Sequence, residues 1–120
     1  MAEKGEHVRI LDKPVTKEDL RASAGEMFGD LVKGVVDVRR ELLSIEAELH
    51  SDLEALLLED GSRQNDLWGI NLYPFLEGAD FLEFDSMINL RPSQSNMSRG
   101  VEDEALRGQI AAIVRKWVEG

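Results

Sequence analysis

The chain has 120 residues, of which 42% are hydrophobic and 32% are charged, and it carries a formal net charge of -10 and no cysteine. These values predict one folded domain over residues 1–120 with a flexible start at residues 1–6. They exclude disulfides and thiol chemistry, and they disfavour a disordered chain. The acidic charge disfavours non-specific nucleic-acid binding, and the lack of a leader-like or long apolar run predicts a cytoplasmic protein without a membrane segment.

The N-terminal part predicts a short strand followed by a helix. Residues 7–11 form the strand candidate. Thr16 and Asp19 stand three residues apart in the pattern of a capping box, which marks the start of a helix. Apolar residues then recur at helical spacing up to a glycine, so the helix is expected over residues 17–28.

The next part predicts an antiparallel hairpin. Apolar and polar residues alternate over residues 31–38 and again over residues 43–49, which is the period of a strand with one buried face. The polar segment 39–41 between the two runs is expected to form the turn.

The second half predicts a helix, two more strands and a final helix. Ser51 and Glu54 have the capping-box spacing, and a helix is expected over residues 52–59. Two further runs, 67–73 and 81–90, read as a strand pair. The last helix carries one apolar stripe, made of Leu106, Ile110, Ile113, Val114 and Trp117.

Alternation along the second strand pair separates a core face from a polar face. The core face is expected to contain Trp68, Ile70, Leu72, Leu82, Phe84, Ile88 and Leu90. The polar face is expected to contain Gly69, Asn71, Tyr73, Glu83, Asp85, Met87, Asn89 and Arg91. The expected fold is therefore α+β, a two-layer sandwich in which three helices cover one face of a mostly antiparallel sheet of four to five strands, in the order β-α-β-β-α-β-β-α.

One candidate for chemistry is His50, which lies beside Asp52 and Glu54 where a strand meets a helix. An imidazole near carboxylates suits acid–base catalysis, with Asp52 or Asp66 as orienting partner. The same residues also fit a helix cap and a polar strand face, and this structural interpretation is the stronger one. No spacing of metal ligands occurs, so we expect no metal and no cofactor.

The other candidate is the long polar loop over residues 91–99, which precedes the last helix. Its guanidinium, hydroxyl and amide groups have the donors needed to hold a carboxylate or phosphate. Together with the polar sheet face, the loop gives an expected ligand-binding set of Asn71, Tyr73, Asn89, Arg91, Asn96 and Arg99. The same composition is also that of a plain connecting loop.

Two strings, LHSDLEALLLEDGSRQNDLWGINLYP and FDSMINLRPSQSNMSRGVED, hold Trp, Gly, Asn, Tyr and Pro in a fixed register. In these strings the chain resembles a small prokaryotic family, domain of unknown function 5674, over residues 15–117. The resemblance implies no established activity and carries over no catalytic residue.

The sequence thus leaves two functions open. The first is a binding or interaction module that holds a small anion or a protein partner on the polar sheet face and the 91–99 loop. It would also form a homodimer through exposed sheet edges. The alternative is a small hydrolase or metal-assisted enzyme that uses His50 with Asp52 or Asp66.

Overall fold

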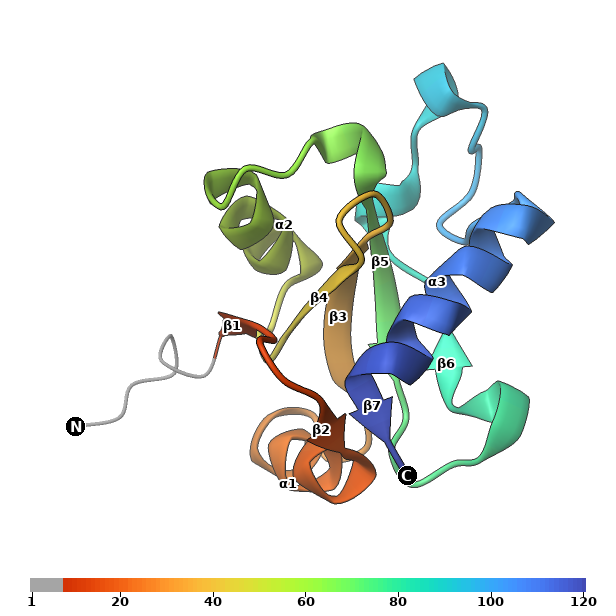
Figure 1. Ribbon diagram of the computed structural model, residues 1–120. Helices are drawn as coiled ribbons and strands as arrows, with labels where there is room; N and C mark the ends of the chain where they lie inside the picture. Colours follow the sequence, from red (N-terminus) through yellow and green to blue (C-terminus); the bar gives the residue numbers. More distant parts are fainter. Residues whose placement is uncertain (1–7) are drawn as a thin grey trace.

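A computed structural model describes residues 8–120 as an α+β fold with three helices and a five-stranded antiparallel sheet (Figure 1). The helices are α1 (Lys17–Met27), α2 (His50–Glu59) and α3 (Glu104–Trp117). The sheet has the order β1 (Arg9–Ile10), β4 (Leu42–Ile45), β3 (Val32–Asp37), β5 (Leu67–Leu72) and β6 (Leu82–Glu83). A separate parallel pair joins β2 (Val15–Thr16) to β7 (Val118–Glu119). The predicted class, the number of helices and the main sheet are confirmed.

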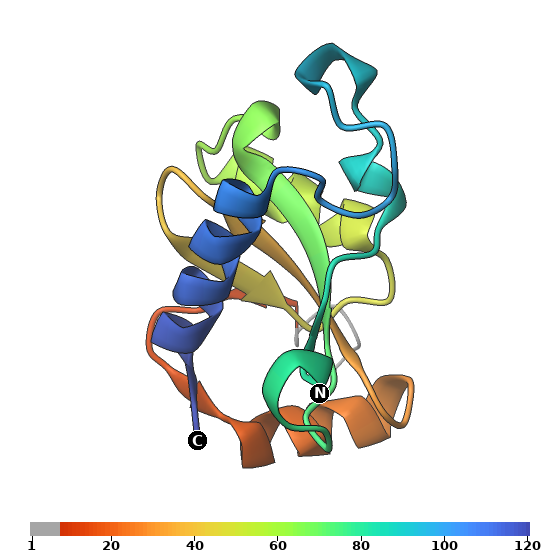
Figure 2. The same cartoon turned by 90° about the vertical axis from the view of Figure 1, so that its right-hand side faces the viewer.

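The sheet is apolar on both of its faces. Trp68, Ile70 and Leu72 of β5 pack with α1 and α3, as the alternation predicted. On the opposite face, Val35 and Leu67 pack against α2. Helices therefore lie on both sides of the sheet, whereas the sequence analysis placed all three on one side (Figure 2). The reason is that β3 carries apolar side chains at consecutive positions and not only at alternate ones.

The two predicted helix caps have different outcomes. At α1 the capping box is present, because Asp19 N donates to Thr16 Oγ1 and Thr16 N donates to Asp19 Oδ2, each at 3.0 Å. At α2 the capping box of Ser51 and Glu54 is wrong. The helix begins one residue earlier than Ser51, at His50, and its N-cap is Leu49, which has no side chain able to cap.

The strand predicted over residues 81–90 is wrong beyond Glu83. The chain pairs with β5 only through β6 and then forms two short 3₁₀ turns, Met87–Asn89 and Pro92–Gln94. Ile88 consequently packs with the α2 cluster and not with the predicted core face, while Leu90 is 40% exposed. The predicted hairpin of residues 31–49 is confirmed as β3 and β4, although β4 ends at Ile45.

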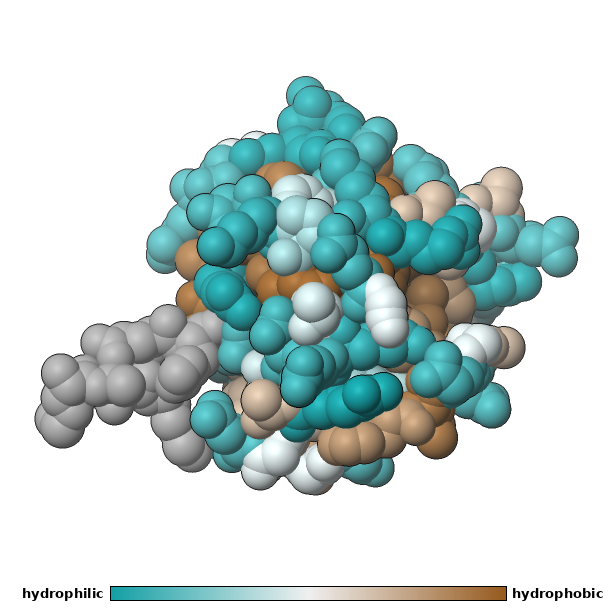
Figure 3. All heavy atoms as spheres, turned by 60° about the horizontal axis from the view of Figure 1, so that its bottom comes forward, coloured by the Kyte–Doolittle hydropathy of each residue, from teal (hydrophilic) through white to brown (hydrophobic). Residues whose placement is uncertain are grey.

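The surface seen in Figure 3 is mainly hydrophilic, with smaller apolar patches among the charged side chains. Within residues 8–120, no helix is both long and apolar enough to cross a membrane. The expectation of flexibility at residues 1–6 and the start of the first strand at His7 lie outside the described residues. The rest of that first strand is shorter than predicted, since β1 has two residues.

Candidate functional site

Asn89 takes the place of a strand where the sheet lacks one. After the two residue pairs of β6, Gly69 of β5 has no strand on that side. The Asn89 amide supplies both missing bonds: its Oδ1 accepts from Gly69 N at 2.8 Å and its Nδ2 donates to Gly69 O at 3.0 Å. Asn89 is fully buried, so its amide stabilises the fold by hydrogen bonding to β5, as a peptide group of a neighbouring strand would.

Asn96 organises the long loop in the same way. Its Nδ2 donates to Asn89 O and Gly100 O, both at 2.8 Å, and its Oδ1 accepts from Glu102 N at 2.9 Å. With 4% of its surface exposed, Asn96 is buried inside the loop that it shapes. Its hydrogen bonds tie the loop to the start of the segment leading into α3.

The guanidinium group of Arg91 likewise donates hydrogen bonds to carbonyl oxygens of the protein backbone. Its Nε donates to Ile88 O and its Nη1 to Gln64 O, both at 2.9 Å, and its Nη2 donates to Leu67 O. The guanidinium lies 4.4 Å from the centre of the Trp68 ring. Burial lowers the pKa of Arg91 from its ordinary value. The structure thus gives Arg91 a structural role, and its predicted contact with an anion stays a prediction.

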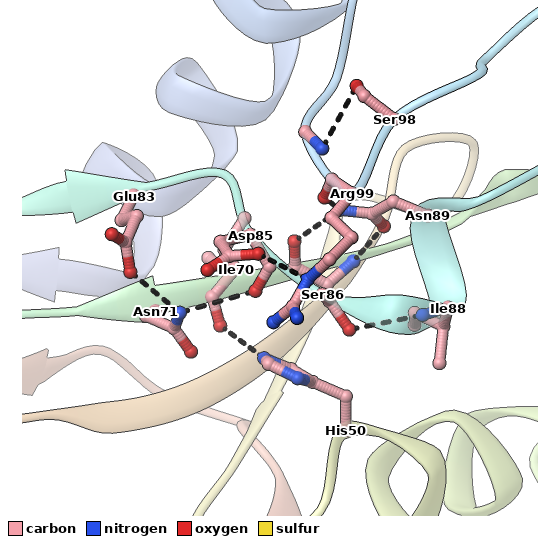
Figure 4. A network of polar contacts seen from close by, with 12 residues as sticks. His50, Ile70, Asn71, Glu83, Asp85, Ser86, Ile88, Asn89, Ser98 and Arg99 are labelled. Carbon is pink, nitrogen blue, oxygen red and sulfur yellow. Dashed lines mark hydrogen bonds and ion pairs between the residues drawn. The ribbon is translucent and has the colours of Figure 1, made fainter.

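Three of the predicted residues, His50, Asn71 and Arg99, line one pocket of about 240 Å³ between α2, β5 and the 85–99 segment (Figure 4). The remaining lining residues are Leu31, Lys33, Leu49, Ser51, Asp85, Ser86, Met87 and Ile88. Tyr73 does not line this pocket. Its hydroxyl donates to Glu83 Oε1 at 2.9 Å, and burial raises the pKa of Tyr73 to about 12.

His50 is held in one orientation at the first residue of α2. Its Nε2 lies 2.8 Å from Ile70 O, and because a carbonyl only accepts, Nε2 carries the proton and donates. Burial lowers the pKa of His50, although the hydrogen bond to Ile70 O acts in the opposite direction. His50 is therefore a neutral imidazole near pH 7.

Asn71 carries the one buried side-chain polar atom without a hydrogen bond among the described residues. Its Nδ2 donates to Glu83 Oε1 at 2.8 Å and to Asp85 O at 3.2 Å. Both partners are acceptors, so the amide nitrogen must face them and the assignment of the two amide atoms is fixed. Its Oδ1 then has no hydrogen bond of ordinary geometry, although Asn71 lies close enough to the His50 ring to raise the pKa of His50. Asn71 is 7% exposed and lines the pocket. An orphaned buried acceptor costs about 1–3 kcal/mol unless a ligand or water supplies a donor.

The mouth of the pocket combines charges with apolar side chains. Arg99 and Asp85 form an ion pair at 2.7 Å, and both side chains are about half exposed. Lys33 is close enough for its positive charge to lower the pKa of His50 further. Leu49 and Met87 add large apolar groups that are mostly exposed to solvent.

The proposed catalytic partners of His50 are not hydrogen-bonded to it. Asp66 directly precedes β5 and forms an ion pair with Arg39 at 3.3 Å. Asp52 lies exposed in the first turn of α2. In the part of the chain that the structure describes, no three His, Asp or Glu residues are grouped so that they could hold a metal ion.

Sequence reasoning missed Lys33 and Ser86 as members of the pocket. Ser86 is buried against Gly69, where a Cβ would lie 2.5 Å from Ser86 Cβ. A glycine inside an apolar strand is the one sequence signal for such a close approach. Lys33 gives no comparable signal, because an alternating lysine in a strand is ordinary.

No curated protein and no solved structure matches the chain. A family model, described as Protein of unknown function (DUF5674), matches residues 9–117, and this range contains every residue that lines the pocket. The match covers nearly the whole chain, so the protein belongs to this family.

Proposed function

We propose that the protein is a binding module whose ligand is a small polar molecule held in the pocket of His50, Asn71 and Arg99. The observation that carries the proposal is the buried Asn71 Oδ1, an acceptor without a hydrogen bond on a residue that lines the pocket. A ligand that donates an N–H or O–H to this oxygen would remove the cost of leaving it unpaired.

The pocket also suggests the rest of the ligand. Its volume of about 240 Å³ is slightly below the range of about 300–1,000 Å³ typical of drug-sized ligands, so the ligand is small. Lys33 and Arg99 at the mouth favour an anionic group at the outer end, provided that the Arg99 side chain keeps a free donor beside Asp85. The best candidates are therefore small carboxylates or phosphates that also carry an amine, amide or hydroxyl.

A thermal-shift screen with amino acids, their amides, nucleobases, and small carboxylates and phosphates tests this proposal. At ten times its Kd, a ligand adds about 1.4 kcal/mol of stability, or about 5 °C in Tm for a domain of this size. We expect a compound with both a donor and an anionic group to raise Tm. In two-dimensional NMR, the same compound should shift the side-chain amide signals of Asn71.

Three variants separate the pocket from the wider polar face. Lys33→Gln and Arg99→Gln keep the fold but remove the charges at the mouth, so affinity for the hit should fall about three- to tenfold each. Tyr73→Phe is the matched control, because Tyr73 directly follows β5, the strand that carries Asn71, but lies outside the pocket. A hit that shifts NMR signals elsewhere, or that binds all three variants equally, would contradict the proposal.

The alternative of a His50-dependent enzyme receives less support. The imidazole donates to the carbonyl of Ile70, whereas a catalytic pair needs a carboxylate or nucleophile at about 2.6–3.2 Å. Turnover of ester or phosphoester substrates that is lost in His50→Gln would favour the enzyme over the binding module.

The proposal includes two expectations on setting and assembly. The cytoplasm remains the proposed compartment. The second expectation is self-association through sheet edges, giving a homodimer or a protein complex. The edges offer little for such pairing, because the edge strands β1 and β6 have two residues each and short edges pair poorly. Sedimentation equilibrium at high concentration decides the matter, and a monomer would remove the homodimer from the proposal.

A further inference from the structure

A second cavity, a groove of about 760 Å³, lies between α3 and residues 78–84 and is separate from the His50 pocket. Figure 2 shows α3 on one side and the segment that contains β6 on the other. The apolar residues that line it are Ala79, Phe81, Leu82, Phe84, Ala111, Val114 and Val118. Its lining runs along α3 from Glu104 to Arg115, a length of about 16 Å at 1.5 Å per residue, and continues to Val118 of β7.

The charged residues around this apolar groove are mostly basic. Lys17, Arg107 and Arg115 contribute to its lining, against the single acid Glu104. This local excess of positive charge contrasts with the net charge of -10 for the whole chain. Arg107 is bound to the chain, since its Nη1 donates to Val101 O at 2.6 Å. Arg115 has no ion pair with any residue that the structure describes.

Lys17 and Arg115 mark the end of the groove nearest the last turn of α3. Lys17 already holds a carboxylate there, because its Nζ lies 3.0 Å from Glu77 Oε1 and 4.7 Å from the centre of the Phe81 ring. The two partners differ in exposure: the Lys17 side chain is 16% exposed and the Glu77 side chain is 78% exposed. An ion pair with a solvent-exposed carboxylate is weak, so the mostly buried Lys17 ammonium can exchange Glu77 for another carboxylate at little cost.

We propose that this groove binds a single-chain amphiphile with a carboxylate head group. The hydrocarbon chain lies along α3 against the aromatic wall, and the head group binds Lys17 and Arg115 in place of Glu77. Burial of each methylene contributes about 0.8 kcal/mol, so a chain of medium length supplies most of the affinity and the cations select the sign of the head group. The proposal is independent of the ligand of the His50 pocket.

Titration with decanoate, decylammonium and decanol tests the proposal, because the three probes share a chain and differ in charge. NMR spectra of the wild-type protein should show decanoate shifting the amide signals of Gly108 and Ala111. Decanoate should bind at least about tenfold more tightly than decylammonium. Equal binding of the three probes, or shifts confined to another surface, would overturn the proposal.

Two single variants should change decanoate affinity in opposite directions. Arg115→Gln removes a cation without an ion-pair partner, and affinity should fall about three- to tenfold. Glu77→Gln removes the competing carboxylate, and affinity should rise by a similar factor. Lys116→Gln is the matched control, because Lys116 is the next residue of α3 but contacts Glu41, away from the groove.

The sign of the Glu77→Gln effect is the sharpest result, since general loosening of the fold would not improve binding. Unchanged or weaker binding in this variant would refute the exchange at Lys17. Tight binding of an acidic amphipathic peptide together with no binding of decanoate would replace the amphiphile by a protein partner, and so would also overturn the proposal.

Discussion

The contact between β5 and the segment after β6 is tested most directly by Gly69→Ala. A Cβ at position 69 would lie 2.5 Å from Ser86 Cβ and 2.6 Å from Ser86 Oγ, where real Cβ contacts do not fall below 3.0 Å. Ser86 Cβ is attached to the backbone, so no rotation of the side chain removes the clash. The 85–89 segment has to move, which also strains the hydrogen bonds between Asn89 and Gly69.

The expected loss of stability combines these two effects. Overpacking in a tight interior costs about 1–3 kcal/mol, and weakening a buried hydrogen bond costs about 1 kcal/mol more. Gly69→Ala should therefore lower the free energy of unfolding by about 3 kcal/mol. Urea denaturation, followed by the fluorescence of Trp68 and Trp117, measures this loss.

Two further variants make the reasoning refutable. Ser86→Gly removes both clashing atoms, so the double variant with Gly69→Ala should be more stable than the sum of the single effects by about 1.5 kcal/mol. Gly25→Ala is the matched control in α1, where a new Cβ meets no atom within 4 Å, and it should stabilise by about 0.5–1 kcal/mol. A cost of less than about 1 kcal/mol for Gly69→Ala, or strict additivity with Ser86→Gly, would show that the close approach is wrong.

Three other predictions concern the cap, the histidine and the loop. Thr16→Ala should cost about 1 kcal/mol in urea denaturation, because it removes the acceptor for Asp19 N. The free energy of unfolding should fall as the pH drops below about 6.5, because His50 takes up a proton at its ordinary pKa only in the unfolded chain. Unfolding measured between pH 7.5 and 5 checks this, and the decrease should be smaller in His50→Gln. Asn89→Ala should cost about 3 kcal/mol and should speed hydrogen exchange at the amide of Gly69, while an unchanged exchange rate would argue against its role as a strand substitute.

Local patterns predicted much of the fold. The Thr16 capping box and the alternation of Trp68, Ile70 and Leu72 are both determined by neighbours in the sequence, and both are present. The failure beyond Glu83 has a physical reason. The alternation is interrupted there, because Ser86 stands at a core position and Met87 at a polar one, and it resumes only with Ile88 and Leu90. At Gly69 the backbone bonds of β5 are taken by the Asn89 side-chain amide, and strand patterns contain no signal for such a substitution.

Three residues of the pocket, His50, Asn71 and Arg99, were candidate site residues, but their meeting in one pocket was not predicted. His50 and Asn71 were both candidates, in two different proposed sites, and they meet because α2 packs on the second face of the sheet. The apolar residues at consecutive positions of β3 indicate that second face, but only the tertiary structure decides which helix covers it. Asn89, Arg91 and Asn96 were predicted as ligand contacts, and the structure directs their donors to backbone carbonyls.

The parallel pair of β2 and β7 joins residues about 100 positions apart, Val15 with Val118 and Thr16 with Glu119. Thr16 is at the same time the N-cap of α1, and β7 directly continues α3. Opening of this pair would therefore uncap one helix and release the last turn of another in a single event. The two helices on this side of the sheet should consequently behave as one cooperative unit, with amide protons that become exposed together and at the same free energy of opening.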